Sequence, residues 1–140
     1  MLFDFLPGKD SQLNIQLELN GTQLGEYFGA SVLAVDLTGD GKAELLVGAP
    51  QHSLSPETGD RTGDEGKVYF YLNRNGNLEK SSALYGNKAR DARFGTTMAS
   101  VGDINRDGFN GMIDDFKSNL IFQFKFIKSH RRRYWSTLRE

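Results

Sequence analysis

The sequence predicts an all-β fold built from repeated units, and three observations support that prediction. Glycine is frequent, at 16 of 140 residues, and falls between short apolar runs, as in chains with many tight turns. Val68, Phe70 and Leu72 alternate with two tyrosines, which is the period-two pattern of a strand. A stretch near residue 30 recurs near residue 100, which indicates an internal repeat.

The internal repeat sets the expected organisation of the chain. Residues 27–41 align with residues 93–108 when Gly102 is treated as an insertion, so a Phe-Gly pair and an Asp-Gly pair occur in both. The period is longer than the roughly 40–50 residues of well-known propeller repeats. Residues 51–66 are polar and rich in Gly, Pro, Ser and Thr, so we expect a long surface loop there that accounts for the excess.

Further strands are expected on both sides of this loop. Residues 45–50 form a short apolar run that ends in proline, and residues 13–19 alternate apolar with polar side chains. Residues 73–77 supply Asn and Gly for a hairpin turn after the strand at 68–72. The repeat stops near Asn110, because no second apolar run of the 45–50 type follows it.

One loop carries the residue types of a divalent-cation site. Calcium takes six to eight oxygen ligands, and a curled loop with ligands at alternate positions supplies them. In residues 36–44, carboxylates, a hydroxyl and a backbone carbonyl stand at positions one, three, five, seven and nine around a glycine bend, and these ligands are Asp36, Thr38, Asp40, Lys42 through its carbonyl, and Glu44. Position twelve is Val47, and no helical pattern flanks the loop, so an EF-hand is not expected.

The simpler alternative is that Asp40 and Gly41 form only a hairpin turn among solvated polar residues. Three nearby carboxylates repel one another unless a cation neutralises them. The same spacing also recurs in the second repeat, so we favour the metal.

The second loop, residues 103–111, repeats most of this ligand set. Asp103, Asn105, Asp107 and the Phe109 carbonyl stand at positions one, three, five and seven, but the ninth position is Gly111. We therefore expect weaker binding at this loop. Asp114 or Asp115 is the alternative source of a further carboxylate.

These residues resemble the FG-GAP repeat, and their sequence is similar to integrin alpha chains in particular. The resemblance covers roughly residues 13–110 and is carried by residues 23–32 (QLGEYFGASV), 45–50 (LLVGAP), 66–72 (GKVYFYL) and 92–95 (ARFG). It implies a fragment of a seven-bladed β-propeller, from its later blades, in a cell-adhesion receptor at the extracellular side of the cell membrane. It also implies Ca²⁺ in the two loops, an integrin beta subunit as partner, and an extracellular-matrix or cell-surface ligand for the complete head.

The resemblance divides the chain into four parts. Residues 1–24 are the expected end of a preceding blade, and residues 25–90 are one complete FG-GAP blade with its calcium loop. Residues 91–110 are the expected start of the next blade with the second calcium loop. Residues 111–140 match nothing in the family and are expected to be a divergent tail outside the propeller.

Other functions find less support in the sequence. The chain is predicted not to be an enzyme, because its two histidines stand in a loop and in the tail and no catalytic motif occurs. Residues 131–133 are three arginines in a chain of net charge −1, which we interpret as a solvated run rather than a nucleic-acid site. Asn20-Gly21-Thr22 is a sequon, which makes Asn20 a candidate glycosylation site.

The chain is also expected to lack a signal peptide and a transmembrane helix of its own. Two alternatives to the receptor fragment stay open: a secreted FG-GAP protein with an accessory propeller, and a non-functional truncated product.

Overall fold

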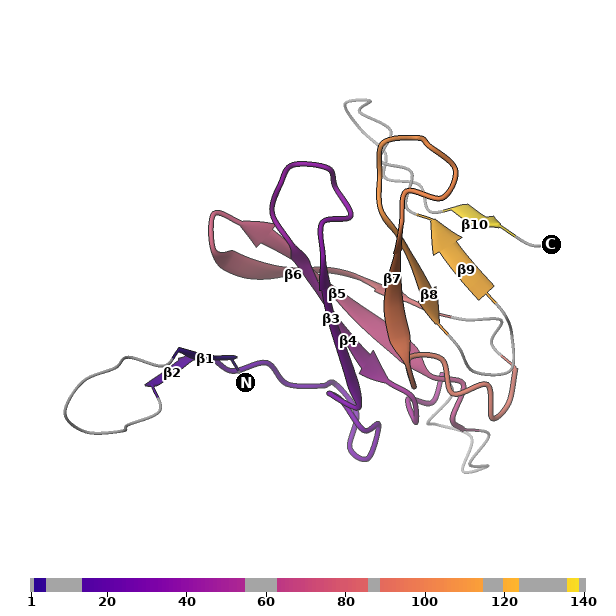
Figure 1. Ribbon diagram of the computed structural model, residues 1–140. Helices are drawn as coiled ribbons and strands as arrows, with labels where there is room; N and C mark the ends of the chain where they lie inside the picture. The colour runs from indigo at the N-terminus through magenta and orange to yellow at the C-terminus, as the bar shows by residue number, and fades with distance from the viewer. Residues whose placement is uncertain are drawn as a thin grey trace.

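The computed structural model describes residues 2–4, 14–54, 63–85, 89–114, 120–123 and 136–138. They form two four-stranded antiparallel sheets and one two-stranded hairpin (Figure 1). The described residues contain no helix, and so none of the length and apolarity needed to cross a membrane. The prediction of an all-β fold is confirmed, and a fragment of a β-propeller fits this architecture.

The first sheet is a simple meander, in which each strand pairs with the next one along the chain. Its strands are β3 (Ser31–Val35), β4 (Glu44–Ala49), β5 (Lys67–Arg74) and β6 (Asn77–Leu84), in that spatial order. The strands expected at 45–50 and 68–72 are β4 and β5. Part of the polar loop expected between them, residues 55–62, lies outside the described residues.

The predicted hairpin turn joins β5 to β6. Asn75 and Gly76 have φ values of 56° and 90°, and the flanking residues Arg74 and Asn77 pair across the turn. Positive φ at both central residues is the mark of a type I′ turn, which Asn-Gly favours. The local sequence therefore decides this connection.

The first sheet is buried on both faces around its central strands. Val68 and Phe70 pack on one face with Leu46 and Phe94, whereas Tyr69 lies in a second cluster on the other face. Residues 67–72 are all buried. An apolar sheet face needs a covering element, so the alternation of Val, Phe and Leu with Tyr marks two cores rather than one buried and one solvated face.

A second sheet repeats the meander. It consists of β7 (Met98–Gly102), β8 (Gly111–Asp114), β9 (Leu120–Gln123) and β10 (Ser136–Leu138), paired in sequence order. We expected residues 111–140 to be a tail outside the propeller, but the described parts of this stretch complete the sheet that β7 begins. Whether this sheet is a propeller blade stays a prediction, as does the division of the chain into four parts.

The two sheets meet where glycine lets backbones approach closely. Gly66 forms an isolated parallel bridge with Phe94, whose side chain is buried, and Met112 of β8 joins the same core cluster. A Cβ atom on Gly48 would collide with the carbonyl oxygen of Gly95. Both Gly48 and Gly95 therefore have to be glycine for this packing.

The N-terminal hairpin pairs β1 (Leu2–Asp4) with β2 (Asn14–Leu17). The strand expected at residues 13–19 corresponds to β2, although residue 13 lies outside the described residues. In Figure 1 this hairpin lies apart from the first sheet, to which residues 18–30 connect it.

The connecting loops of the first sheet divide between its two ends. The β3–β4 loop lies beside the β5–β6 turn, where the Lys42 Nζ donates to the Asn75 side chain at 2.6 Å. Residues 20–30, 51–54 and 63–66 gather at the opposite end, where backbone amides of Gln51 and Gly66 bond to Glu26 and His52 respectively. The β7–β8 loop lies at the same end as the β3–β4 loop (Figure 1).

Candidate metal loops

Four of the five residues that the sequence nominated for the first cation site lie in the β3–β4 loop, and the fifth lies where that loop ends. Asp36 directly follows β3, and Glu44 is the first residue of β4, where it pairs with Val35. Antiparallel pairing of the two strands thus brings positions one and nine of the loop back to the same end of the sheet. Gly39 and Gly41 have φ values of 69° and 82°, which bend the backbone between them.

In the first loop, the Asp36 carboxylate is held by the loop's own backbone. Its Oδ1 accepts hydrogen bonds from the Gly39 and Asp40 amides at 2.7 and 3.3 Å, and its Oδ2 accepts one from the Gly41 amide at 2.8 Å. The Asp40 Oδ1 in turn accepts from the Lys42 amide at 2.9 Å. A carboxylate offers about four lone-pair sites, so Asp36 keeps capacity for one further partner.

Glu44 is the buried carboxylate of this loop, with 1% of its surface exposed. Its Oε2 accepts from the Leu37 and Thr38 amides at 2.8 and 3.2 Å, and its Oε1 accepts from the Thr38 hydroxyl at 3.3 Å. Burial raises the pKa of Glu44, and the negative charge of Asp40 raises it further, against the effect of these hydrogen bonds. The ionised form of Glu44 therefore carries a free-energy cost that a nearby cation would offset.

The β7–β8 loop repeats three backbone hydrogen bonds of the first loop. Asp103 Oδ1 accepts from the Asp107 amide at 2.9 Å, and Asp103 Oδ2 accepts from the Gly108 amide at 2.8 Å. Asp107 Oδ1 accepts from the Phe109 amide at 3.0 Å. Arg106 and Gly108 also have positive φ values, 59° and 90°, at the positions that Gly39 and Gly41 occupy in the first loop.

The two loops differ at their ninth position and in the contacts of their fourth and third residues: the Gly39 amide bond to Asp36 occurs only in the first loop, and Asn105 accepts from the Asp107 amide at 3.1 Å only in the second. Gly111 pairs with Gly102 and contributes no carboxylate, whereas the Asn105 amide group donates to Asp107 Oδ2 at 3.0 Å. Asp114 does not reach back to this loop, because its buried Oδ2 accepts from the Gly95 amide at 2.6 Å. Asp115 lies outside the described residues.

In each loop, the acidic side chains accept hydrogen bonds from backbone amides and do not converge on one point. Across the residues that it describes, no three His, Cys, Asp or Glu side chains gather closely enough to hold a metal ion. The chemistry of the donor set nevertheless fits a hard cation, because every nominated ligand is an oxygen and the first loop carries three carboxylates.

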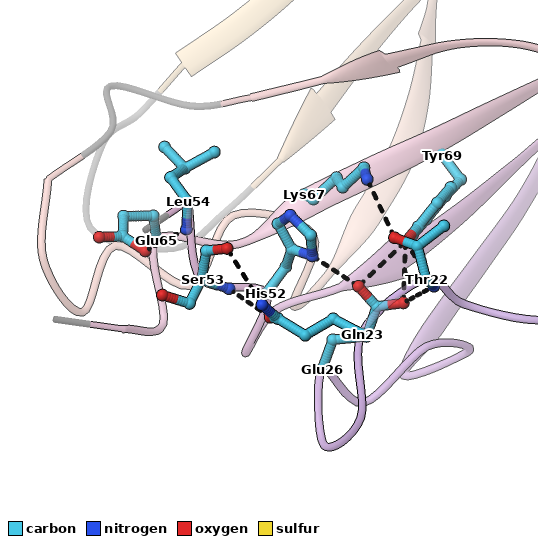
Figure 2. A network of polar contacts seen from close by, with 9 residues as sticks. All are labelled: Thr22, Gln23, Glu26, His52, Ser53, Leu54, Glu65, Lys67 and Tyr69. Carbon is cyan, nitrogen blue, oxygen red and sulfur yellow. Dashed lines mark hydrogen bonds and ion pairs between the residues drawn. The ribbon is translucent and has the colours of Figure 1, made fainter. Parts of the chain in front are cut away.

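A second polar site, at the opposite end of the first sheet, was not found by sequence reasoning. Glu26 is 1% exposed and accepts hydrogen bonds from the Tyr69 hydroxyl at 2.8 and 3.0 Å and from the Thr22 amide at 2.6 Å (Figure 2). The His52 Nδ1 lies 2.6 Å from Glu26 Oε2, and the Lys67 ammonium lies 4.2 Å from the centre of the Tyr69 ring.

This network ties three segments together. Burial acts to raise the pKa of Glu26, but the hydrogen bonds from Tyr69, His52 and the Thr22 and Gln23 backbone outweigh it and hold the pKa below its ordinary value. Burial, together with the neighbouring Glu26 charge, raises the pKa of Tyr69 to about 12. The network thus consists of an ionised carboxylate and a neutral phenol that fix residues 20–28 and 51–54 against β5.

Only a weak sequence signal marks this network. Glu26 stands two residues before the first Phe-Gly pair, and the residue in the same place of the second repeat is Ala92. The internal comparison therefore shows that the repeats differ there, but it does not show that Tyr69 or His52 is the partner.

Two features of the chain recur: an antiparallel meander, and a Phe-Gly pair followed by a glycine-bent acidic loop. Such recurrence is typical of repeat proteins. The profile of the FG-GAP repeat matches residues 28–71, from just before β3 into β5.

Integrin alpha chains are the relatives that match over most of the sequence. Integrin alpha-4 of Xenopus laevis is 46% identical over 103 residues, which cover 72% of this chain and 9% of the relative. Integrin alpha-PS3 of Drosophila melanogaster is 44% identical over 90 residues, which cover 64% of this chain and 8% of the relative. Integrin alpha-11 of Homo sapiens is 38% identical over 116 residues, which cover 78% of this chain and 9% of the relative.

These findings confirm the prediction of a partial integrin alpha chain that carries an FG-GAP repeat. The chain spans less than a tenth of the length of the relatives that it matches.

Proposed function

We propose that this chain is part of the head of an integrin-alpha-type adhesion receptor, in which the sheet β3–β6 is one propeller blade and the β3–β4 and β7–β8 loops bind Ca²⁺. Calcium in these loops would brace the blades rather than take part in catalysis, and we propose no enzymatic activity. The FG-GAP match and the integrin relatives support the receptor assignment.

One observation carries the calcium proposal: two loops far apart in sequence adopt the same hydrogen-bonded conformation. In both loops, the aspartate at position one accepts from the amides at positions five and six, and the aspartate at position five accepts from the amide at position seven. A solvated hairpin turn would not require the same carboxylates at the same positions twice.

The residues proposed to hold the ions are those that the spacing nominated. In the first loop they are Asp36, Thr38, Asp40, the Lys42 carbonyl and Glu44, and in the second Asp103, Asn105, Asp107 and the Phe109 carbonyl. A bound cation supplies positive charge at the buried Glu44 and so offsets its desolvation. The second loop lacks the ninth carboxylate, and we expect weaker binding there.

By extension from the relatives, the complete protein would act at the extracellular side of the cell membrane. Its partners would be an integrin beta subunit and an extracellular-matrix or cell-surface ligand. We also propose Asn20 as a glycosylation site, since Asn20 is exposed and Thr22 of the same sequon follows in a surface segment.

Calorimetric titration with CaCl₂ tests the ion sites. We expect two binding events, with affinities in the range of roughly 0.1–1 mM that is typical of extracellular calcium modules, and Asp40→Ala should abolish the stronger one. Asp91→Ala is the matched control, because Asp91 is an exposed aspartate outside both loops. Absence of binding, or equal binding by the Asp40 variant, would contradict the calcium proposal.

A chimera tests the receptor role separately. Residues 14–110 would replace the matching segment of a full-length integrin alpha relative that is co-expressed with a beta subunit. We expect the chimera to reach the cell surface as a heterodimer and to support adhesion, whereas a chimera with Asp36→Ala and Asp40→Ala should reach it less well. A chimera that folds and pairs but never supports adhesion would count against the assignment.

A further inference from the structure

The two candidate metal loops touch each other directly, although they lie on different sheets. The Asn110 Nδ2 donates a hydrogen bond to the backbone carbonyl of Asp36 at 2.9 Å, across 74 positions of sequence. The Phe109 ring covers Gly39, where a Cβ atom would lie only 3.3 Å from two ring carbons. Strands β3 and β7, which lead into the two loops, are also in contact.

Each of these contacts involves a residue that shapes a candidate site. Asp36 is position one of the first loop, and its carboxylate holds the loop through three backbone amides. Phe109 is position seven of the second loop, where its carbonyl is a nominated ligand, and its amide is held by Asp107. Ordering Phe109 and Asn110 therefore also orders Asp36 and Gly39.

The covering of Gly39 by Phe109 makes this contact specific. Gly39 has φ +69°, which side-chain-bearing residues adopt only with strain, and a Cβ atom there would press on the Phe109 ring at 3.3 Å. Phe109 and Asn110 are both partly buried. The first loop thus meets the second through a tight backbone-to-ring contact and a hydrogen bond rather than through long, mobile side chains.

We propose that the two loops are energetically coupled, so that a divalent cation in one raises the affinity of the other. This inference rests on the proposed calcium function. A cation that orders one loop removes conformations that the other loop would otherwise have to lose on binding, which produces positive cooperativity without a change of fold. Coupling of this kind is reciprocal and commonly amounts to about fivefold or more in affinity.

Nuclear magnetic resonance of the full chain during a CaCl₂ titration reads the two loops separately, through the Gly41 and Gly108 amides. Asp107→Ala disables the second loop, and we expect it to lower the affinity reported by Gly41 about fivefold. When Asn110→Ala is present, adding Asp107→Ala should cause no further loss. Phe109→Leu is a second test, since it keeps the carbonyl but loosens the contact with Gly39.

Asn73→Ala is the matched control. The Asn73 Nδ2 also donates to a backbone carbonyl of the first loop, that of Ala43 at 3.0 Å, but it comes from the end of β5 and not from the second loop. This variant should leave the fivefold effect of Asp107→Ala intact.

The possible outcomes separate this inference from the proposed function. If both loops bind calcium and Gly41 reports the same affinity with and without Asp107→Ala, the coupling is refuted and the calcium function stands. Binding at one loop alone refutes the coupling and limits the calcium function to that loop. Binding at neither loop overturns the calcium function and the coupling together.

Discussion

Replacing Glu44 by glutamine should stabilise the protein without calcium and destabilise it with calcium. Glu44 is buried, and burial and Asp40 raise its pKa. A raised carboxyl pKa means that the folded state favours the protonated form, so the stability that this group contributes is full below pH 4.5 and is lost as the pH rises through the folded pKa. At pH 7 the ionised side chain therefore carries a cost that glutamine lacks.

Glutamine can preserve the hydrogen bonds of this site. Its carbonyl oxygen can accept from the Leu37 and Thr38 amides, as Glu44 Oε2 does, and its amide nitrogen can donate to the Thr38 hydroxyl oxygen in place of the reverse bond. The substitution thus removes the charge with little change in packing. We expect the free energy of unfolding in EDTA at pH 7 to equal or exceed that of the wild type.

Calcium should reverse the order of stability of the wild type and Glu44→Gln. A ligand at ten times its dissociation constant stabilises a folded protein by about 1.4 kcal/mol through mass action. The wild type should gain about this amount from the first loop, whereas Glu44→Gln should gain little there. Glu44→Gln should therefore be at least as stable as the wild type in EDTA and less stable than the wild type in calcium.

Urea unfolding at pH 7, in EDTA and in about 10 mM CaCl₂, measures both effects. Glu79→Gln is the control, because Glu79 is a 58% exposed glutamate on β6, and we expect a change within about 0.5 kcal/mol in either condition. Equal stabilisation of wild type and Glu44→Gln by calcium would refute the ligand role of Glu44. A variant that is less stable than wild type in EDTA would refute the desolvation argument.

Three further predictions concern the packing of the first sheet. Hydrogen bonds outweigh burial at Glu26 and lower its pKa. The stability that Glu26 contributes should therefore be present above pH 4.5 and be lost as the pH falls through the folded pKa. Urea midpoints measured between pH 7 and pH 3 should fall less steeply for Glu26→Gln than for wild type. Tyr69→Phe removes the hydroxyl that donates to this carboxylate and should cost about 1.5–3 kcal/mol of unfolding free energy; a loss below about 0.5 kcal/mol would show that the network contributes little. Gly48→Ala would press on the Gly95 carbonyl and should cost about 1–3 kcal/mol, whereas Ala34→Ser, at an exposed position of β3, should leave the urea midpoint unchanged.

Local sequence signals predicted the strands and turns of the first sheet well. The period-two run at 68–72 became the centre of β5, and Asn75-Gly76 formed the expected hairpin turn. Such features depend on neighbouring residues, because alternation and positive φ are properties of a few consecutive positions. The alternation did not reveal that both faces of β5 are buried, since that depends on what each face meets.

The end of the second repeat was harder to predict. The sequence after Asn110 lacks the apolar run of the first repeat, and we expected a tail there, yet β8, β9 and β10 extend the sheet from β7. Strand pairing uses backbone groups that every residue except proline carries. A segment can therefore complete a sheet without the side-chain pattern that would identify it in the sequence.

The sequence alone determined the repeat, the all-β class, and the candidate ligands, because the spacing of Asp36, Asp40 and Glu44 around a glycine bend is a local property. Only the tertiary structure decided that Glu26 is buried against Tyr69 and that Asn110 bonds to Asp36. These pairs lie 43 and 74 positions apart. The first contact depends on how residues 20–28 fold back over β5, and the second depends on how the two sheets pack. No pattern within either segment specifies these arrangements.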